Sequence, residues 1–511
     1  MRRPQSTWEG LISSFWFVPS LMTVGAVLLF VVTLQLEGLV PSNVSGLPVV
    51  FSGGADAART VLSVISGSLI TVVATVFSLT IVALQLASAN YSPRLLRNFT
   101  SDRGVQVVLG AYIGTFTYAL LVLRVIRTPK GTTGAFVPII SVTAAVLLAL
   151  VCVALLVYFI HHIASLIQSS TIVRRVRLVT LKSVSKLEDL GRPPAEEADP
   201  ADRPEVRELL REDPLVVRAK DSGYVQYVYA AEAAGAVAEA VAGAGARAVG
   251  GAAEETVVEI PFGPGRFVAG GLPLLKVWPA PEGGLDPRSE DGARDAIVLG
   301  RERSFGQDFA FGLRQLSDIA LKGVSPGVND PTTAMQAMDQ MEAVFVALGG
   351  KAMPPRRWEV ERGGSRVLIK VGRYGFEDAV GVAFDQLRRA SFTSGQVAVL
   401  ERLLEVLERA LGANEIPGRR AALWERAFAV GRLAPGGVSD PRDAARLVLR
   451  AVAVGAPLLE TELGAGVGAE LEELADLSEG LAGGGLVREA FDAASRGARR
   501  APAERPQTGT P

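Results

Sequence analysis

Long apolar runs are confined to the first third of the chain, and they predict four membrane-spanning helices. The runs lie near residues 15–36, 61–88, 105–123 and 136–160. Each run has the roughly 20 apolar residues that a helix needs to cross about 30 Å of hydrocarbon. Arg2 and Arg3 precede the first run, as in a signal peptide, but its apolar core is too long and no small-residue cleavage site follows. We therefore interpret the first run as a retained span.

The second run carries a polar stripe. Its polar residues recur at steps of three, four, three and seven, and they are Ser68, Thr71, Thr75, Ser78 and Gln85. This spacing places them on one helix face. One interpretation is helix packing, because small and hydroxyl side chains let membrane helices approach closely. The other is a hydrated path, in which hydroxyls replace part of the water shell of an ion. No Asp, Glu, Lys or Arg lies within the stripe, which argues against a proton relay.

The third run contains a related pattern in the sequence GAYIG. Gly110 and Gly114 lie four positions apart, so they share one side of a helix. Glycines at this spacing allow a neighbouring helix to pack closely. We expect a helix contact at this point.

Beyond about residue 165 the pattern becomes that of a cytosolic α+β region. Residues 166–214 predict a juxtamembrane helix followed by a charged, proline-rich linker. Residues 215–285 predict a small β-rich domain, and residues 290–499 predict a mostly helical domain before a disordered tail at 500–511. The predicted fold class is an α-helical multi-pass membrane protein with four spans, followed by a cytosolic α+β region that is mostly helical towards the C-terminus.

Two segments of this region predict local structure. RRWEVERGGSRVLIKV, residues 356–371, predicts a β-hairpin with Gly363 and Gly364 at the turn. GPGRFVAGGLPLLKV, residues 263–277, resembles the closing turn of biotinyl-lipoyl-like domains. The modifiable lysine between two apolar residues of a hairpin tip is missing, so this resemblance concerns the fold alone.

A turn in the helical part is a candidate binding site. Ser325–Gly327 predicts the turn, and Asn329 or Asp330 can cap a helix that Pro331 begins. Capping alone accounts for such a sequence. The alternative is that the free N–H groups and the dipole of the helix bind an anion or a partner. The residues that would form this site are Arg301, Arg303, Arg314, Ser325, Asn329 and Asp330.

The composition argues against an enzyme. Because His occurs only at 161 and 162, the cytosolic part cannot contain a Ser-His-Asp or Cys-His set. The chain has no HExxH, no paired CxxC and no P-loop motif, so we predict no cofactor and no metal. Asp308, Asp318 and Asp330 could form a carboxylate site, but helices of this kind routinely carry solvated acids.

Charge and the rare residues narrow the picture further. The formal net charge is −1, which gives no indication of a nucleic-acid partner. Cys152 is the only cysteine and lies in the fourth run, so no intramolecular disulfide can form. His161 and His162 close this run, and neighbours on a helix point about 100° apart. They cannot share one metal within a chain. We expect histidines at the membrane interface, or a pH-sensing ring around an oligomer axis.

Several phrases together resemble one family. Besides the four apolar runs, they are SLTIVALQLASANYSPRLLRNF, SGYVQ and SFGQDFAFGLRQLSDIALKGVSPGVNDPTTA. They are similar to the bacterial predicted membrane proteins catalogued as domain of unknown function 2254, over roughly residues 10–430. YSPR and SPG-x-NDP-x-TA are the most specific parts. The resemblance implies a multi-pass inner-membrane protein with no established activity or ligand.

Basic residues near the ends of the runs predict the orientation. One side would carry Arg2, Arg3, Arg94, Arg97, Arg103, Arg174, Arg175, Arg177, Lys182 and Lys186. The other side would carry Arg59, Arg124, Arg127 and Lys130. The ten-to-four split places both termini in the cytoplasm.

Two functional hypotheses follow. The first is a homo-oligomeric channel or transport-like protein, in which the second run lines the path and the cytosolic half regulates or assembles it. The second is a membrane-anchored sensor or scaffold that binds a protein partner through its cytosolic half. In both, the lipid bilayer is a partner and nucleic acid is not, while the ligand or ion stays open.

The orientation can be tested with reporter fusions. Alkaline phosphatase fused after Lys186 should be inactive, because the enzyme needs the periplasm to form its disulfides. The same reporter fused near Pro41 should be active. The reverse pattern of activities would contradict the cytosolic placement of the second half of the chain.

Overall fold

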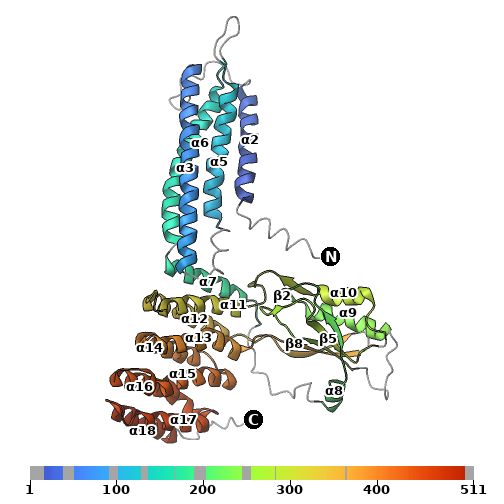
Figure 1. The fold of residues 1–511 in the computed structure, drawn as a ribbon, viewed down its shortest axis with the longest axis vertical. Helices are drawn as coiled ribbons and strands as arrows, with labels where there is room; N and C mark the ends of the chain where they lie inside the picture. The colour runs from blue at the N-terminus through green and yellow to red at the C-terminus, as the bar shows by residue number, and fades with distance from the viewer. Residues whose placement is uncertain are drawn as a thin grey trace, which may run out of the picture. The chain divides into compact units, whose positions relative to one another are not determined.

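A computed structural model describes nine segments of the chain. They are residues 16–37, 51–90, 102–127, 136–166, 168–188, 203–243, 255–281, 283–362 and 365–500. The chain divides into two compact units, Met1–Ile172 and Val173–Pro511. Figure 1 labels helices and strands of both units.

The first unit is a bundle of long apolar helices. They are α2 (Phe17–Glu37), α3 (Ala55–Asn90), α5 (Arg103–Val125) and α6 (Ile139–Leu166). Among the described residues, these four are the helices long and apolar enough to cross a membrane. The prediction of four such helices at the N-terminal end is therefore confirmed, and their insertion into a membrane stays a prediction.

Helix α5 is the centre of this bundle. Of its most apolar 18-residue window, 61% is buried, against 6%, 17% and 22% for α2, α3 and α6. Its two buried tyrosines have hydrogen-bond partners inside: Tyr112 donates to the carbonyl of Cys152 at 2.7 Å, and the Tyr118 hydroxyl lies 2.9 Å from Thr33 Oγ1. Hydrogen-bonded in this way, they can be buried without a large desolvation cost.

The glycine pair of α5 marks the contact with α2. A Cβ at Gly110 would lie 2.6 Å from Met22 Sδ and 3.1 Å from Pro19 Cα, and one at Gly114 would lie 3.3 Å from the carbonyl oxygen of Met22. The close helix approach expected from GAYIG is therefore confirmed. The absence of side chains at these two positions lets the backbones meet.

The second unit begins within α7 (Ser169–Val184) and continues into two sheets. The strands are β1 (Leu215–Arg218), β2 (Gly223–Val228), β3 (Glu255–Ile260), β4 (Phe267–Val268), β5 (Pro273–Trp278), β6 (Ile297–Gly300), β7 (Arg357–Arg362) and β8 (Ser365–Val371). One sheet has the order β1-β5-β3-β8-β7, and the other β4-β2-β6. The short helices are α8 (Pro204–Leu209), α9 (Ala230–Gly243) and α10 (Pro287–Asp295). Apolar residues of α9, α10 and both sheets form one core.

The larger sheet joins segments that are distant in the sequence. Strands β3 and β8 pair in parallel, with Val257 opposite Leu368, and β7 pairs with β8 antiparallel, so the predicted hairpin is confirmed outside its turn. The turn residues, Gly363 and Gly364, lie outside the described residues. The sheet therefore takes strands from both sides of the boundary expected near residues 285–290. Residues 263–277 contribute β4 and β5, which both pair antiparallel.

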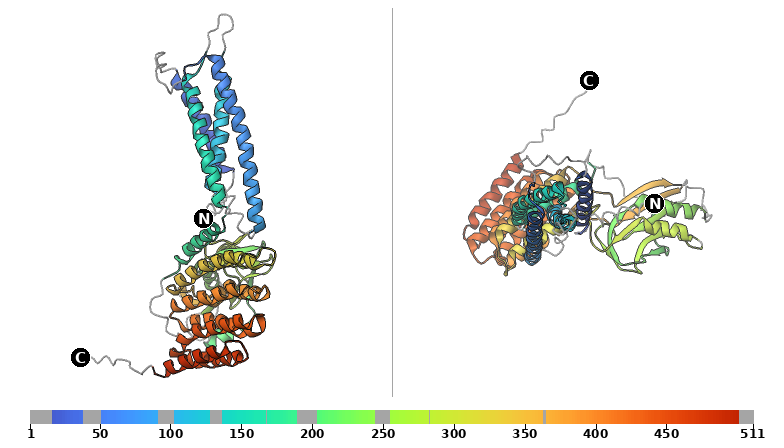
Figure 2. Two further views of the ribbon diagram at one scale, coloured as in Figure 1. Left: turned by 90° about the vertical axis from the view of Figure 1, so that its left-hand side faces the viewer. Right: turned by 90° about the horizontal axis from the view of Figure 1, so that it is seen from above.

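The rest of this unit is a stack of paired helices. They are α11 (Ala310–Val324), α12 (Pro331–Gly349), α13 (Phe376–Thr393), α14 (Val397–Gly412), α15 (Pro417–Gly437), α16 (Pro441–Gly455), α17 (Gly464–Ser478) and α18 (Gly484–Arg500), with a 3₁₀ turn at Ala456–Glu460. Successive pairs lie in layers (Figure 2). Odd-numbered helices pack on odd-numbered ones and even on even, which forms two columns.

Ion pairs connect the even column. Arg402 of α14 lies 2.8 Å from Asp339 and 2.9 Å from Glu342, both on α12. In the next layer, Arg450 of α16 lies 2.8 Å from Glu408 of α14. Because such pairs are partly exposed, the buried leucine and valine faces of the helices supply most of the stability, and the pairs fix the register.

The glycine contact of the first unit gives a stability prediction. Gly110→Val should lower the free energy of unfolding by about 1–3 kcal/mol, because Met22 can move aside but the backbone of Pro19 cannot. Thermal melting of the purified full-length protein in detergent measures this. Gly25→Val on α2 is the matched control, since a Cβ there has nothing within 4 Å. Equal losses for both variants would contradict the close approach.

Candidate functional site

The polar stripe lies on the outer face of α3. Its five members are all exposed in the single chain, and they are Ser68, Thr71, Thr75, Ser78 and Gln85. The inward face carries Leu62, Leu69 and Val76, which are 0%, 6% and 1% exposed. The stripe therefore takes no part in the packing of its own bundle. Among the described residues, no side chain covers the stripe.

Small side chains make up most of the stripe. Thr71 and Thr75 return their hydroxyls to the helix, donating to the carbonyls of Gly67 at 3.0 Å and of Thr71 at 3.1 Å. A Cβ at Gly67 would have nothing within 4 Å, so this face is open. Within the described residues, the side chains of Ser68 and Ser78 make no hydrogen bond. Small residues with spare polar atoms on an apolar helix suit contact with another helix or with water.

At one end of the bundle, His162 of α6 contacts the N-terminus of α5. His162 Nε2 lies 2.8 Å from Asp102 Oδ1, and the ring of Tyr158 stacks on His162 with centroids 5.2 Å apart. Asp102 also caps α5 by accepting from Val105 N at 3.2 Å. A Cβ at Gly104 would lie 2.7 Å from His162 Nε2, so only glycine fits beneath the ring. His161, by contrast, is exposed.

In the second unit, Arg303 and Asp308 form a buried ion pair before α11. Arg303 donates from Nε to Asp308 Oδ2 at 2.9 Å and from Nη2 to Oδ1 at 3.1 Å. Asp308 also accepts from Phe311 N at 3.1 Å, and its side chain is 1% exposed. A Cβ at Gly265 would lie 2.2 Å from Asp308 Oδ2. The loop between β3 and β4 therefore closes directly over the carboxylate.

Aromatic rings complete this cluster. The Arg266 guanidinium lies 4.6 Å from the ring centre of Tyr374, and that of Arg303 lies 5.0 Å from the ring centre of Phe311. Burial raises the pKa of Asp308 to about 6, although the Arg303 guanidinium acts in the opposite direction. The carboxylate is thus enclosed and bidentately paired. It holds the β3–β4 loop against the start of α11.

The turn at Ser325–Asp330 is held by its own hydrogen bonds. Asp330 caps α12, as predicted, by accepting from Thr333 N at 3.0 Å and from Thr333 Oγ1 at 2.6 Å. These bonds, that from the Thr333 hydroxyl first, lower the pKa of Asp330. Asn329 has φ 48°, a left-handed conformation that Asn tolerates, and its Oδ1 accepts from Gln396 Nε2 at 2.7 Å. Gln396 thereby ties this turn to the next helix pair.

The structure does not bring the six candidate anion-site residues together. Arg303 precedes α11 and is paired with Asp308, whereas Ser325 follows α11 at its other end. A 15-residue helix separates them, which is about 22 Å. Arg314, within α11, lies 3.0 Å from Asp318, and Arg301 is exposed. Arg303 and Arg314 thus each pair with an acid close by in the sequence, and Asp330 bonds to Thr333. Asp308, Asp318 and Asp330 do not form a shared carboxylate site.

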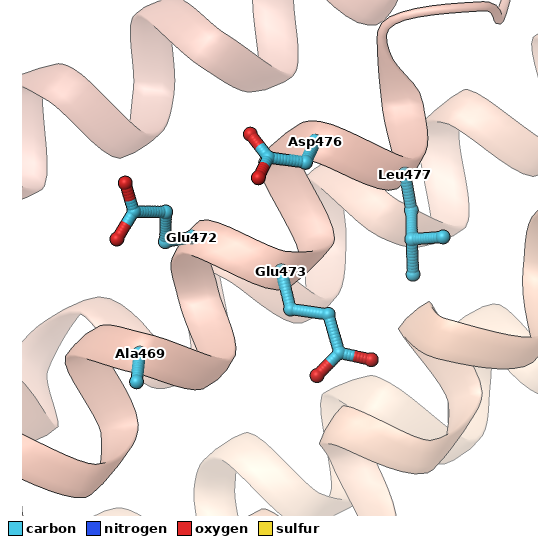
Figure 3. A pocket seen from close by; sticks show the side chains of 5 residues that line it. All are labelled: Ala469, Glu472, Glu473, Asp476 and Leu477. Carbon is cyan, nitrogen blue, oxygen red and sulfur yellow. The ribbon is translucent and has the colours of Figure 1, made fainter.

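An open hollow lies on α17 at the far end of the helical stack. It is lined by Ala469, Glu472, Glu473, Asp476 and Leu477 (Figure 3). Glu473 points away from the other two acids, and Asp476 is paired with Arg488 at 2.8 Å. Among the described residues, no group of three or more His, Cys, Asp or Glu is placed to hold a metal ion. Three of the five residues that line the hollow are acidic, so its surface is acidic.

The sequence contained a signal for one of these clusters and none for the other. Asp102 begins the third apolar run and His162 ends the fourth, and antiparallel neighbours bring such ends together. The pairing of Arg303 with Asp308 had no comparable signal. The two residues lie five apart in a segment without periodicity, and only burial by the β3–β4 loop distinguishes them from solvated charges.

Long apolar helices at the N-terminal end, followed by a mixed helix and strand region, define a predicted membrane protein. The chain belongs to the family described as Predicted membrane protein (DUF2254), whose model matches residues 12–409. It is similar to the Uncharacterized protein Mb1321c of Mycobacterium bovis and the Uncharacterized protein Rv1290c of Mycobacterium tuberculosis. Each is 35% identical over 417 residues, which is 81% of this chain and 74% of the relative. No solved structure matches the chain. The family resemblance of the sequence is confirmed.

The geometry of Asp330 predicts a purely structural role. Asp330→Ala should cost about 0.5–2 kcal/mol of stability through loss of the cap. Asp330→Asn, which can still accept a hydrogen bond from Thr333, is the matched control. This variant should retain most of the wild-type stability. A cellular phenotype in Asp330→Ala at unchanged protein level and melting temperature would contradict this and favour a binding role.

The buried carboxyl predicts a pH dependence of stability. Because the folded pKa of Asp308 is raised to about 6, its contribution is fully present below its unfolded pKa and is lost as the pH rises through about 6. Between pH 5 and 7.5 the loss amounts to about 1.4 kcal/mol. The melting temperature of the wild type should therefore fall more over this interval than that of Asp308→Asn. Parallel pH profiles of the two proteins would contradict the raised pKa.

Proposed function

We propose that the protein is a homo-oligomeric channel or transport-like protein of the bacterial inner membrane, with α3 stripes from several copies facing one axis. The observation that carries this proposal is the outward orientation of the stripe. Ser68, Ser78 and Gln85 are exposed on a helix that also turns apolar residues such as Val64 and Phe77 outward. In hydrocarbon, unpaired polar atoms are costly, so a second α3 or a water-filled path is favoured over lipid.

The shape of the stripe supports contact between copies. Gly67, Thr71 and Thr75 recur every four residues and are exposed, which is the small-residue spacing that lets two helices approach closely. Around a higher-order axis, the same hydroxyls would line a narrow hydrated path. Both termini face the cytoplasm in this arrangement, because of the basic residues at the ends of the apolar runs. The family and its uncharacterized relatives leave the ion or solute open.

The second candidate function is a membrane-anchored scaffold. The two-column stack of α11–α18 favours it, because stacked helix pairs present long continuous surfaces that other proteins can bind. In this alternative, the α3 stripe serves only to assemble the membrane part. An enzymatic role has less support, since Asp308, the most enclosed carboxylate described above, is already paired with Arg303.

Cysteine substitutions distinguish these possibilities. In a Cys152→Ala background, Thr75→Cys should form oxidative cross-links between copies and react with a membrane-impermeant thiol reagent several-fold faster than Val76→Cys, which faces the bundle interior. Phe77→Cys is the matched outer-surface control. It lies about 160° from Thr75 around the helix, and it should neither cross-link nor label.

The pattern of outcomes separates the hypotheses. The hydrated path is supported if Thr75→Cys both cross-links and labels, and if Thr75→Leu abolishes flux into liposomes. Leucine at this position would fill and dry the path. Cross-linking without labelling or flux reduces the stripe to an assembly surface and leaves the scaffold. Absence of cross-links at Thr75 under conditions that preserve the fold would contradict the oligomer.

A further inference from the structure

Helix α7 has an outer face that combines cations with apolar residues. Arg174, Lys182 and Lys186 are exposed and Arg175 is half-exposed, while Leu178 is 52% and Val179 37% exposed among them. On a helical wheel the five of these residues that lie within α7 occupy one continuous arc, and Lys186 lies in the turn after the helix end at Val184. No Asp or Glu occurs between Ser169 and Leu187. This stretch therefore carries several cations and no acid of its own, together with apolar surface.

The opposite face of α7 fixes which side points outward. Val173, Val176 and Val184 are 2%, 1% and 1% exposed. Thr180 lies against α11 so closely that a Cβ at Gly312 would be 1.7 Å from its Oγ1, and Ser183 donates to the carbonyl of Phe305 at 2.6 Å. Helix α7 is thus locked on the second unit by its inner face. The cationic face cannot rotate inward.

The sequence connection places this face near a membrane surface. Helix α6 ends at Leu166 and α7 begins at Ser169, so only two residues separate them. Two residues span at most about 7 Å. If α6 crosses the bilayer, the start of α7 lies within reach of the lipid headgroups. Cations this close to an anionic surface are attracted to it, and neighbouring apolar side chains can enter the interface.

We propose that the outer face of α7 binds the anionic phosphodiester headgroups of the cytoplasmic leaflet, with Arg174, Arg175, Lys182 and Lys186 at the phosphates and Leu178 and Val179 inserted between them. This inference rests on the membrane crossing of α6 in the proposed function. It does not depend on the oligomer or on a conducting path. A membrane-bound α7 would hold α11, and with it the helical stack, at the lipid surface.

The experiment uses the full-length Cys152→Ala protein in lipid nanodiscs, with an environment-sensitive dye on Leu178→Cys. In discs of phosphatidylcholine with phosphatidylglycerol, the dye emission should shift to the blue, and nitroxide lipids should quench it several-fold more than in discs of phosphatidylcholine alone. Raised salt should reverse most of the difference, because exposed charges are screened.

A charge-matched pair of variants isolates α7. The triple variant Arg174→Gln, Lys182→Gln and Lys186→Gln should lose the response to phosphatidylglycerol. The control Arg211→Gln, Arg288→Gln and Arg442→Gln removes as many exposed cations elsewhere in the second unit, and it should keep the response. Equal emission in neutral and anionic discs would overturn the proposal, as would a response that survives in the triple variant. A dye shielded in every disc would show that protein covers this face, which would also overturn it.

The same preparations separate this proposal from the proposed function. Failure of the protein to enter nanodiscs would contradict the membrane crossing itself. Loss of the Thr75→Cys cross-links with an intact α7 response would contradict the oligomer alone. A normal cross-link without any α7 response would contradict the headgroup contact alone.

Discussion

Polar atoms on apolar helices need a partner within the protein or in water, and the first unit is arranged around this constraint. Tyr112, Tyr118 and Thr33 are buried, and each has a hydrogen-bond partner on a neighbouring helix or beside it. Helix α3 is satisfied less well, because Ser66 Oγ is buried without a hydrogen-bond partner and the polar stripe faces outward. The proposed function gives this stripe a partner in a second copy. This constraint is the physical basis of the proposed oligomer.

In the second unit the main constraint is different: each layer of helices or strands must bury its apolar face against a neighbouring layer. Each helix pair of α11–α18 buries one face on the next pair, and the larger sheet acquires β7 and β8 from a segment 100 residues downstream of β3. The Arg303–Asp308 pair joins the β3–β4 loop to α11 at the boundary between these two architectures. Helix α7 packs on the same part of α11, since Thr180 lies against Gly312.

Much of the fold could be predicted because it depends on local patterns. Apolar runs of sufficient length predicted α2, α3, α5 and α6, and Asp330 with Pro331 predicted the start of α12. The parallel pairing of β3 with β8 could not be predicted, since their residues are distant and both strands are short. The separation of the six candidate anion-site residues could not be predicted either. Spacing along the chain does not reveal that a whole helix separates Arg303 from Ser325.

The four long apolar helices, the start of α12 and the polar face of α3 follow from residue patterns within one element, so they can be predicted from the sequence. The direction in which that face points depends on the packing of the bundle. Leu62, Leu69 and Val76 pack inward because they bury more apolar area, and this turns Ser68, Thr75 and Ser78 outward. The same competition among faces turned the cations of α7 away from α11. Which of two faces is buried depends on the neighbouring elements, and a periodic pattern alone does not specify them.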